Sequence, residues 1–470
     1  MISAIAHRGP DDTGVSASAN IVIGHCRLAV IDPHGGRQPM HVSRSDGSNV
    51  VVCFAGEVYN YRDLRALLVE AGHQFRTTSD TEVVSRAYLE WGVDAFRRLR
   101  GMFAIAINDE RSQSLVLCRD QLGIKPLYLR ASSSSVVFSS ELRGLFVDEQ
   151  RMQIDLEGAC ELLGLWPYRS PRSGVLQGVE ELQAGTYMII GPGGRRRYRY
   201  WELTQRDHLD SLQETAERVR LLVETSVREQ LTSDVPLTVL LSGGIDSSAV
   251  AAMAALHWSR SDGLQAYTLE LPESAAQFVP SVFRPNLDAP FAAQMAKHAS
   301  ISLISVSISD QDVVDGEPAT TTARDMPDNG DMDTTLDVLF AHVARDYKVC
   351  LTGEGADEIF GGYPWSASAA TQPLTTFPWL ESLCFPSEFI AASLRETIRE
   401  YQSSAFEAAV ASAPISRQDL KTTAGRERLT SYLDIAWFLP GQLERMDRIS
   451  MWNSVEARVP FCSAEIVDYC

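Results

Sequence analysis

The sequence predicts an α+β domain followed by an α/β domain with a doubly wound parallel sheet and trailing helices. The first half holds short β-rich runs bounded by Gly, Asn, Asp or Ser, which is typical of antiparallel strands. The second half alternates short apolar strands with helices, which is typical of a parallel sheet. Residues 191–210 are rich in glycine, arginine and polar residues, so we place the domain boundary there.

Five runs in the first half have the composition of strands. They are Val50–Phe54, Phe103–Ile107, Leu115–Cys118, Val136–Phe138 and Tyr187–Ile190. Two helical patterns interrupt them, over Tyr61–Ala71 and Thr81–Leu99, and Asp80 is placed to cap the second helix. This part of the chain is therefore expected to form a layered α+β domain.

The second half begins with a long amphipathic helix over Leu212–Gln230. Strands and helices then alternate through Leu237–Leu241, Ser247–Leu256, Ala266–Leu271, Ala289–Ala299, Ile301–Val306, Thr334–Arg345 and Lys348–Thr352. Two polar stretches, residues 272–290 and 310–333, interrupt the alternation and are expected to be long loops, which are often functional.

Composition and charge exclude several classes of protein. Of 470 residues, 45% are hydrophobic and 22% charged, values that argue against disorder and fibrous folds. Acidic residues outnumber basic ones 61 to 42, and the net charge of -19 would repel a nucleic-acid backbone. The basic cluster at residues 195–199 is interpreted as a solvated turn without a role.

Cysteine usage and hydropathy predict a cytoplasmic protein. The 8 cysteines include no C-x-x-C pair, and most lie in apolar runs, as in a reducing compartment. The first ten residues contain no signal-peptide core, and no apolar run approaches the length of a membrane span. We therefore expect neither a membrane nor nucleic acid as a partner.

A glycine-rich turn follows the strand predicted over residues 237–241. The segment Leu240-Leu241-Ser242-Gly243-Gly244-Ile245-Asp246-Ser247-Ser248 leads directly into an alanine-rich helix. Such a turn presents backbone N–H groups and a helix N-terminus to an anion. No Lys-Ser or Lys-Thr pair follows the glycines, so it is not a Walker P-loop. Asp246 would repel bare phosphate but could hold Mg²⁺ that bridges phosphates. The alternative is an ordinary turn capped by Asp246 and Ser247.

A second turn, rich in glycine and acids, follows the strand predicted over residues 348–352. Its sequence is Thr352-Gly353-Glu354-Gly355-Ala356-Asp357-Glu358. In a parallel sheet the ligand crevice lies outside the carboxyl ends of the strands, so both turns are expected to face one site. Asp357 could complete a Mg²⁺ site with Asp246, and Glu354 could act as an acid or base. The alternative is a helix start capped by acids.

Motifs along essentially the whole chain resemble the glutamine-dependent asparagine synthetases. Residues 242–247 resemble the SGGxDS pyrophosphate loop of the N-type ATP pyrophosphatases, and residues 353–363, GEGADEIFGGY, resemble the synthetases themselves. Further matching segments are HRGPD at 7–11, GEVYN at 56–60, SDTE at 79–82, GMFA at 101–104, RDQLGIKPLY at 119–128 and VEARVPF at 455–461.

The resemblance implies a type-2 glutamine amidotransferase-like domain over residues 1–195 and an asparagine synthetase-like ATP pyrophosphatase domain over residues 210–470. The first domain would be an αββα sandwich like that of the N-terminal-nucleophile (Ntn) hydrolases, and would release ammonia from glutamine. The second would use ATP and Mg²⁺ to adenylate a carboxylate, and ammonia would then displace AMP to leave an amide. The implied partners are an aspartate-like carboxylate, ammonia or glutamine, and a second copy in a homodimer.

The same resemblance assigns the site residues. Those for ATP and pyrophosphate are Leu240, Ser242, Gly243, Gly244, Asp246, Ser247, Leu269, Thr352 and Gly353. The catalytic residues are Glu354, Asp246 and Asp357, of which Asp246 and Asp357 are also the metal ligands. The glutamine pocket comprises Arg27, Gly56, Glu57 and Asp80, with Arg27 and Asp80 facing the carboxylate and the amine of glutamine.

The chain departs from the family pattern in both halves. It opens without the cysteine nucleophile of such a glutaminase, and Ala55 replaces the asparagine that would supply one donor of the oxyanion hole. It ends at Cys470, before a lysine that the family supplies later, and Ser463 stands where the family usually has Asp. These departures predict an N-terminally truncated, inactive glutaminase and a C-terminally truncated synthetase domain.

Three functions remain open. The first is an amide ligase that uses an aspartate-like acid, favoured because residues 325–327 and 331–335 resemble the corresponding loop of bacterial-type asparagine synthetases. The second is a β-lactam-synthetase-like enzyme, or another amide ligase of specialised metabolism. The third is a non-catalytic paralogue that binds nucleotide without turnover.

Overall fold

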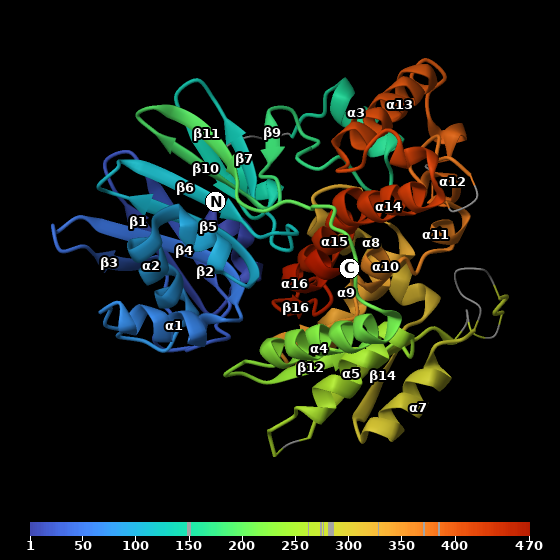
Figure 1. Ribbon diagram of the computed structural model, residues 1–470, viewed down its shortest axis with the longest axis horizontal. Coiled ribbons are helices and arrows are strands. Elements are labelled where there is room, and N and C mark those ends of the chain that lie inside the picture. Colours follow the sequence, from blue (N-terminus) through green and yellow to red (C-terminus); the bar gives the residue numbers. More distant parts are fainter. Residues whose placement is uncertain are drawn as a thin grey trace.

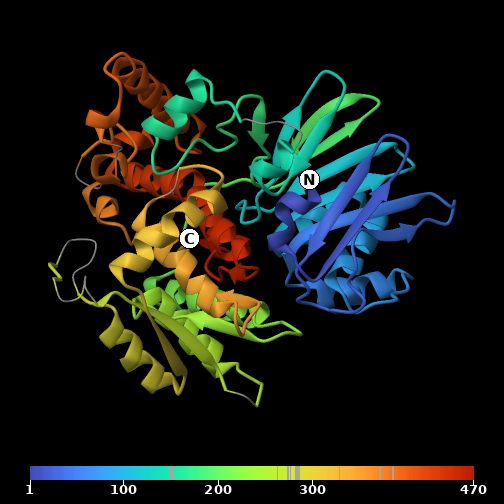
Figure 2. The same cartoon turned by 180° about the vertical axis from the view of Figure 1, so that it is seen from behind.

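Two domains pack along one face in the structure, a computed structural model (Figure 1). It describes residues 1–147, 152–261, 263–272, 275, 277–280, 286–327, 329–369, 372–383 and 386–470. The N-terminal domain is drawn blue through teal to green and the C-terminal domain mainly yellow-green to red, and the view from behind shows the same arrangement (Figure 2).

An antiparallel sheet of six strands forms the centre of the N-terminal domain, in the order β11-β10-β6-β5-β4-β3. The strands are β3 (Met40–Ser43), β4 (Asn49–Val58), β5 (Gly101–Asp109), β6 (Ser114–Arg119), β10 (Thr186–Gly191) and β11 (Gly194–Arg199). The central strands β5 and β6 are buried almost throughout, as expected for strands covered on both faces.

Helices cover one face of this sheet and two small sheets cover the other. The helical layer consists of α1 (Tyr61–Glu70), α2 (Asp80–Trp91) and the 3₁₀ helix η2 (Gly92–Arg98). The other face packs on β1 (Asp12–Ala17), β2 (Val22–Arg27), β7 (Tyr128–Ala131), β8 (Val136–Ser139) and β9 (Val179–Glu181). The 3₁₀ helices η1 (Ile2–Arg8) and η3 (Leu142–Leu145) lie at the edge of these sheets. This layering confirms the predicted α+β class.

Five parallel strands form the sheet of the C-terminal domain, in the order β14-β13-β12-β15-β16. They are β12 (Leu237–Leu240), β13 (Gln265–Glu270), β14 (Ser302–Ser307), β15 (Val349–Leu351) and β16 (Glu456–Arg458). Along the chain, β13 and β14 are added on one side of β12, and β15 and β16 are then added on its other side. The topological switch point, where such sheets bind ligands, therefore lies between β12 and β15.

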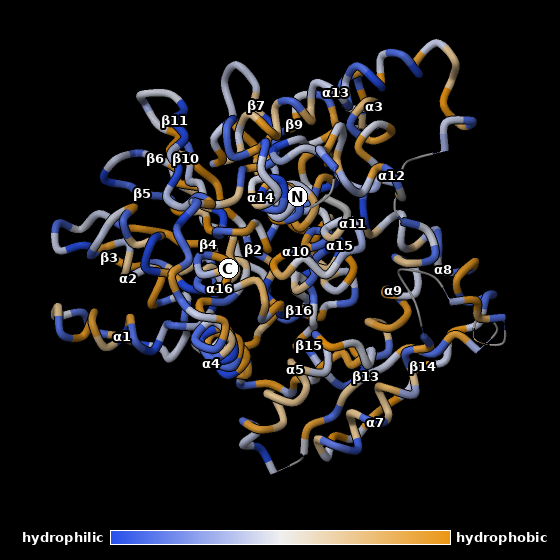
Figure 3. The backbone as a smooth tube through the Cα atoms, turned by 45° about the vertical axis from the view of Figure 1, so that its right-hand side comes forward, coloured by the Kyte–Doolittle hydropathy of each residue, from blue (hydrophilic) through white to orange (hydrophobic). Residues whose placement is uncertain are grey.

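Helices cover both faces of this sheet, which confirms the predicted doubly wound α/β class. One face packs on α4 (Leu212–Gln230), α5 (Ile245–Leu256) and α7 (Ala289–Ala299). The other packs on α8 (Asp310–Arg324), α9 (Asp331–Val343) and α15 (Leu439–Trp452). Hydrophilic and hydrophobic residues alternate along α4, as expected for an amphipathic helix (Figure 3).

The trailing helices form a third packed region around an aromatic cluster that includes Trp365, Phe377, Trp379 and Phe438. Its helices are α10 (Ala356–Phe360), α11 (Pro364–Ala369), α12 (Leu380–Leu383), α13 (Arg395–Ser412), α14 (Thr423–Leu433) and the π-helix η6 (Asp434–Phe438), with short η4 (Ser387–Phe389) and η5 (Asp419–Lys421). The last helix, α16 (Ala464–Tyr469), packs on α4 instead. Helix α3 (Leu156–Gly164) lies beside α13 (Figure 1), where Gln402 donates to the carbonyl of Gly164.

Three predictions of local structure were wrong. Residues 81–99 are not one helix, because Gly92, at φ +57°, ends α2 and begins η2. Residues 310–333 are not a loop: they hold α8, which a capping box of Ser309 and Asp312 begins, and the start of α9. The arginines at 195–199 lie in β11, an exposed edge strand, and the turn precedes them.

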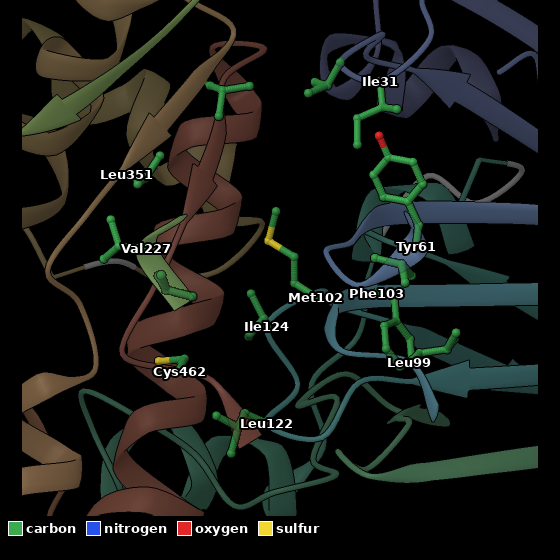
Figure 4. Packing of buried hydrophobic residues seen from close by; sticks show 14 of the residues in the cluster. Ile31, Tyr61, Leu99, Met102, Phe103, Leu122, Ile124, Val227, Leu351 and Cys462 are labelled. Carbon is green, nitrogen blue, oxygen red and sulfur yellow. The ribbon is translucent and has the colours of Figure 1, made fainter. Parts of the chain in front are cut away.

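The other predicted strands and helices are confirmed within a few residues. In the predicted loop at 272–290, residues 273, 274, 276 and 281–285 lie outside the described residues. The last strand of the N-terminal sheet ends at Arg199, and α4 begins the C-terminal domain at Leu212. One buried apolar cluster runs through both domains, with Met102, Ile124 and Leu122 facing Val227 and Cys462 (Figure 4).

Candidate active sites

The two glycine-rich turns lie side by side at the switch point of the parallel sheet. One follows β12 and leads into α5, and the other follows β15 and leads into α10. The turns touch, because a Cβ atom added to Gly353 would lie 2.8 Å from the backbone nitrogen of Ser247. The structure therefore brings together Ser242–Ser247 and Thr352–Asp357, which are far apart in the sequence.

Hydrogen bonds among its own side chains hold the first turn. The hydroxyls of Ser242 and Ser247 lie 2.9 Å apart, and the Ser242 amide donates to the Ser247 hydroxyl at 3.2 Å. Gly243 has φ +96°, and a Cβ there would lie 2.5 Å from the amide nitrogen of Ala292 in α7. Glycine is therefore required for this close approach. The turn is fixed before any ligand arrives, with the N-terminus of α5 behind it.

Asp246 of the first turn and Asp357 of the second lie close enough for their charges to interact. Burial raises the pKa of Asp246, and the negative charge of Asp357 raises it further. Burial also raises the pKa of Asp357. Among the described residues, no group of three or more His, Cys, Asp or Glu side chains is placed to hold a metal ion. The two carboxylates repel each other, and this repulsion favours binding of a cation. Phosphate oxygens of a nucleotide could coordinate the same cation.

The charges of Asp357 and of the buried Arg445 both act on Glu354. Burial raises the pKa of Glu354, the charge of Arg445 opposes that shift, and Asp357 adds to it. The hydroxyl of Thr352, a residue buried just after β15, accepts a hydrogen bond from the Glu354 amide at 3.4 Å. The apolar Leu240 and Leu269 lie at or near the carboxyl ends of β12 and β13. All the residues expected around ATP thus lie at one edge of the sheet.

The four residues expected around glutamine line a separate cavity of about 100 Å³ in the N-terminal domain. Arg27 ends β2, Gly56 and Glu57 lie in β4, and Asp80 begins α2. Gly56 has φ +122°, and a Cβ there would lie 1.9 Å from the carbonyl oxygen of Met102 in β5. No other residue fits this backbone position, which presents Glu57 to the cavity.

Comparison with known proteins follows the same division. Residues 1–201 match the glutamine amidotransferase domain family, and residues 218–470 match the asparagine synthase family. Asparagine synthetase [glutamine-hydrolyzing] 3 of Bacillus subtilis is 36% identical over 474 residues, which span 100% of this chain and 76% of the relative.

The chain belongs to the asparagine synthase family. A second Bacillus subtilis synthetase, number 1, is 29% identical over 100% of this chain and 76% of its own length. Amidase chry2 of Gibberella zeae is 31% identical over 80% of this chain and 56% of the relative. The chain is therefore a carbon–nitrogen ligase of the asparagine synthetase type, and its family uses ATP. None of the helices in the described residues is long and apolar enough to cross a membrane.

Three carboxyl groups, those of Glu57, Asp80 and Glu456, interact in the cavity that Arg27 and Gly56 also line. Burial raises the pKa of Glu57 well above its usual value, and the charges of Glu456 and Asp80 raise it further. Burial also raises the pKa of Asp80 to about 6, despite the amide of Val58 that donates to it at 3.2 Å. Glu456 comes from β16, so the C-terminal domain supplies part of this cavity.

Arg27 and Cys26 also line the cavity, but neither is poised for chemistry. The guanidinium of Arg27 donates to the carbonyls of Pro33 and Asp32 at 2.7 Å and of Ile31 at 3.2 Å, so most of its donors are engaged. Burial raises the pKa of the Cys26 thiol, which keeps it in the less nucleophilic protonated form. Ala55 lines the same cavity and offers no side-chain donor.

Arg458, which was not predicted as a functional residue from the sequence, connects the two sites. Its fully buried guanidinium lies 3.7 Å from Glu57, bonds Glu456 at 2.9 Å, and donates to the carbonyl of Gln230 at 2.6 Å. Its own carbonyl accepts the amide of Thr352 at 2.9 Å. Arg458 lies within the segment VEARVPF, whose apolar residues indicate burial. Because an arginine is rarely buried without a partner, this segment predicts a buried ion pair.

Buried ion pairs between the domains were not predicted from the sequence either. Asp447 in α15 accepts from Arg8 at 2.8 Å and from Lys125 at 2.9 Å, both in the N-terminal domain. Arg8 also donates to Glu141 at 3.2 Å, and Arg448 lies 3.7 Å from Glu141. The HRGPD and RDQLGIKPLY segments therefore meet Asp447 and Arg448 of α15 at the domain interface, where these ion pairs hold the two sites in one relative position.

Proposed function

We propose that this chain joins ammonia to a carboxylic acid, aspartate or a close analogue, with ATP converted to AMP and pyrophosphate. The observation that carries this proposal is the contact between the turn at Ser242–Ser247 and the turn at Thr352–Asp357 at the switch point of the sheet. One turn suits the pyrophosphate of ATP, and the other brings carboxyl groups to the same place.

The reaction has two balanced steps. A carboxylate oxygen of the acid attacks the α-phosphorus of ATP, and pyrophosphate leaves. Ammonia then attacks the acyl carbon, and AMP leaves with the former carboxylate oxygen. The amide groups of the first turn stabilise the leaving pyrophosphate, while Leu240, Leu269, Thr352 and Gly353 contact the nucleotide. In this proposal Glu354 takes the proton that the attacking nitrogen loses.

We propose that Asp246 and Asp357 hold Mg²⁺ together with phosphate oxygens of ATP. The ion would neutralise charge on the phosphates. The mutual repulsion that raises the pKa of Asp246 supports this assignment, because a cation between the carboxylates would relieve it. Two protein carboxylates are a usual share for Mg²⁺, which binds substrate phosphates and water as its other ligands.

We further propose that glutamine is a poor nitrogen source for this chain. Ala55 cannot supply the side-chain donor expected in the oxyanion hole, and loss of one such donor costs about 10²- to 10³-fold in rate. Arg27 has most of its donors engaged by backbone carbonyls, and the thiol of Cys26 is protonated. Three features of one cavity thus oppose glutamine hydrolysis. A homodimer and a cytoplasmic location stay predictions.

The test is to identify products by mass spectrometry after incubation with Mg-ATP and aspartate, with ammonium chloride or glutamine as the nitrogen source. We expect asparagine, AMP and pyrophosphate with ammonium, and asparagine formation with glutamine slower by about 10²-fold or more. Equal rates would contradict the proposal for the glutamine site. Failure with aspartate but amide formation on another acid would change the substrate alone. Nucleotide binding with no pyrophosphate release from any acid would favour a non-catalytic protein.

A further inference from the structure

Strand β11 forms a free edge of the N-terminal sheet. Among the described residues it pairs with β10 alone, and it lies on the outside of the N-terminal domain (Figure 1). Five of its six residues are exposed. The outer side of an edge strand carries unpaired backbone N–H and C=O groups, so another extended chain can pair with it. The proposed function leaves this strand without a role.

Arginines concentrate positive charge along this edge. Four of the six residues of β11 are arginine, and Arg195, Arg197 and Arg199 share one face because side chains alternate along a strand. A fifth, Arg172, lies in the loop before β9. Burial lowers the pKa of Arg172, and the charges of Arg197 and Arg199 lower it further, although Glu180 opposes them. This positive cluster belongs to a chain whose net charge is -19.

Neighbouring carboxylates neutralise only part of this charge. Arg197 donates to Glu180 at 2.6 Å, and Arg199 donates to Glu202 at 2.9 Å. The other two arginines of the strand form no ion pair within the described part of the chain. The Nε atom of Arg197 is buried and has no hydrogen-bond partner there. Positive charges that repel each other, and a buried donor without an acceptor, both favour an anionic ligand.

The two faces of β11 differ in character. A hollow of about 270 Å³ lies on one side, lined by Glu180, Met188 and residues 195–197, and gives an acidic side chain room to reach the arginines. Tyr198 points to the opposite face from Arg197, because side chains alternate, and stacks on Tyr187 with ring centroids 5.1 Å apart. The edge therefore suits an extended chain in which acidic residues alternate with uncharged ones.

The edge does not suit pairing with its own copy. Two β11 strands paired with each other would bring arginines against arginines, and like charges directly opposite destabilise a sheet. Charged residues on an edge strand discourage unselective pairing in the same way. Charge complementarity thus selects an acidic chain, and the open backbone edge selects an extended one.

We propose that β11 docks an extended acidic segment of a partner protein, which pairs with its outer side as an additional strand of the sheet. Backbone hydrogen bonds hold the segment in line with β11. Its carboxylates face Arg195 and Arg197, and its uncharged residues lie on the side of Tyr198. The strand contributes no residue to the glutamine cavity or to the two nucleotide turns, so docking does not depend on the proposed function.

The test measures the fluorescence anisotropy of a labelled peptide in which glutamate and threonine alternate over about ten residues, the upper length of common strands. We expect micromolar binding at low salt that weakens as salt is added. Arg195→Gln combined with Arg197→Gln should weaken binding about tenfold, because each exposed ion pair contributes modestly. The matched control combines Arg399→Gln with Arg417→Gln, at two exposed arginines outside the N-terminal domain, and should bind within about twofold of wild type.

A second peptide separates strand pairing from charge. It has the same sequence with every backbone nitrogen methylated, which removes the backbone donors and keeps every carboxylate. We expect it to bind at least about tenfold more weakly. Equal binding of the two peptides, equal binding by the double variant and its control, or no binding by wild type would overturn the proposal. Tighter binding of a single-stranded oligonucleotide of the same charge, or a dimer in sedimentation that the double variant loses, would also overturn it, in favour of nucleic acid or of a second copy.

Discussion

Asp447 offers a direct test of the charge network that holds the domains together. Its carboxylate accepts from Arg8 at 2.8 Å and Lys125 at 2.9 Å, and all three side chains are 2–6% exposed. Asp447→Asn keeps the shape but leaves two buried cations facing a neutral amide. Breaking a buried pair costs about 3–5 kcal/mol. Because Arg8 retains Glu141, we expect the lower end of that range, about 3 kcal/mol.

The assay is thermal unfolding. If both domains unfold together, an entropy of about 2.1 cal/mol/K per residue over 470 residues gives an unfolding entropy of about 1 kcal/mol/K. The expected loss of about 3 kcal/mol in the free energy of unfolding should therefore lower the Tm by about 3 °C. The matched control is Glu396→Gln, which breaks a pair with Arg399 on a surface where Glu396 is 71% exposed, and should cost under about 1 kcal/mol. A Tm for Asp447→Asn within about 1 °C of wild type would refute the reasoning.

The same variant predicts a dependence on pH. Burial alone would raise the pKa of Asp447, but Arg8 and Lys125 hold it below its usual value. A carboxyl whose pKa falls on folding stabilises the protein above its unfolded pKa, about 4, and loses that contribution as pH falls through the folded pKa. The difference in Tm between wild type and Asp447→Asn should therefore be full at neutral pH and shrink in acid below about pH 4.

Three further predictions concern single positions. Gly56→Ala should destabilise the protein by about 3 kcal/mol, because its Cβ would lie 1.9 Å from a carbonyl oxygen of β5, whereas Gly193→Ala, with no contact closer than 3.9 Å, should cost little in the same urea titration. Burial raises the pKa of Asp434 to about 7, so folding takes up a proton between about pH 4 and pH 7. The stability of the wild type therefore falls as the pH rises through that range. Asp434→Asn should be more stable than the wild type by up to about 4 kcal/mol at pH 8, and by less at pH 5. Asp357→Asn should raise the Mg²⁺ concentration needed for half-maximal pyrophosphate exchange about tenfold, since Asp246 would remain as the one carboxylate ligand.

The fold class and most elements followed from periodicity, because buried strands and amphipathic helices have distinct patterns. The hairpin of β1 and β2 was not predicted, because β1 alternates between half-buried and exposed residues and has few large apolar side chains. Helix α8 was not predicted either, because its composition is polar and Pro318 lies inside it. Its capping box at Ser309 was the readable signal.

The nucleotide turns could be predicted because each is a local motif, and the rule for parallel sheets placed them together. Arg458 and Asp447 could not be placed, because their partners Glu57, Arg8 and Lys125 lie hundreds of residues away and only packing of the two domains joins them. Helix α15 buries Glu444, Arg445, Asp447 and Arg448, and its sequence alone does not show which residues pair with them.

The most direct test of the proposed chemistry follows oxygen. Aspartate labelled with ¹⁸O in its carboxyl groups is incubated with the chain, Mg-ATP and ammonium, and the AMP is examined by mass spectrometry. An acyl-adenylate requires that one labelled carboxylate oxygen leave with AMP, so we predict AMP that carries one ¹⁸O atom alongside asparagine. Unlabelled AMP, or ADP and phosphate in its place, would contradict adenylation of the carboxylate at the site formed by the two turns.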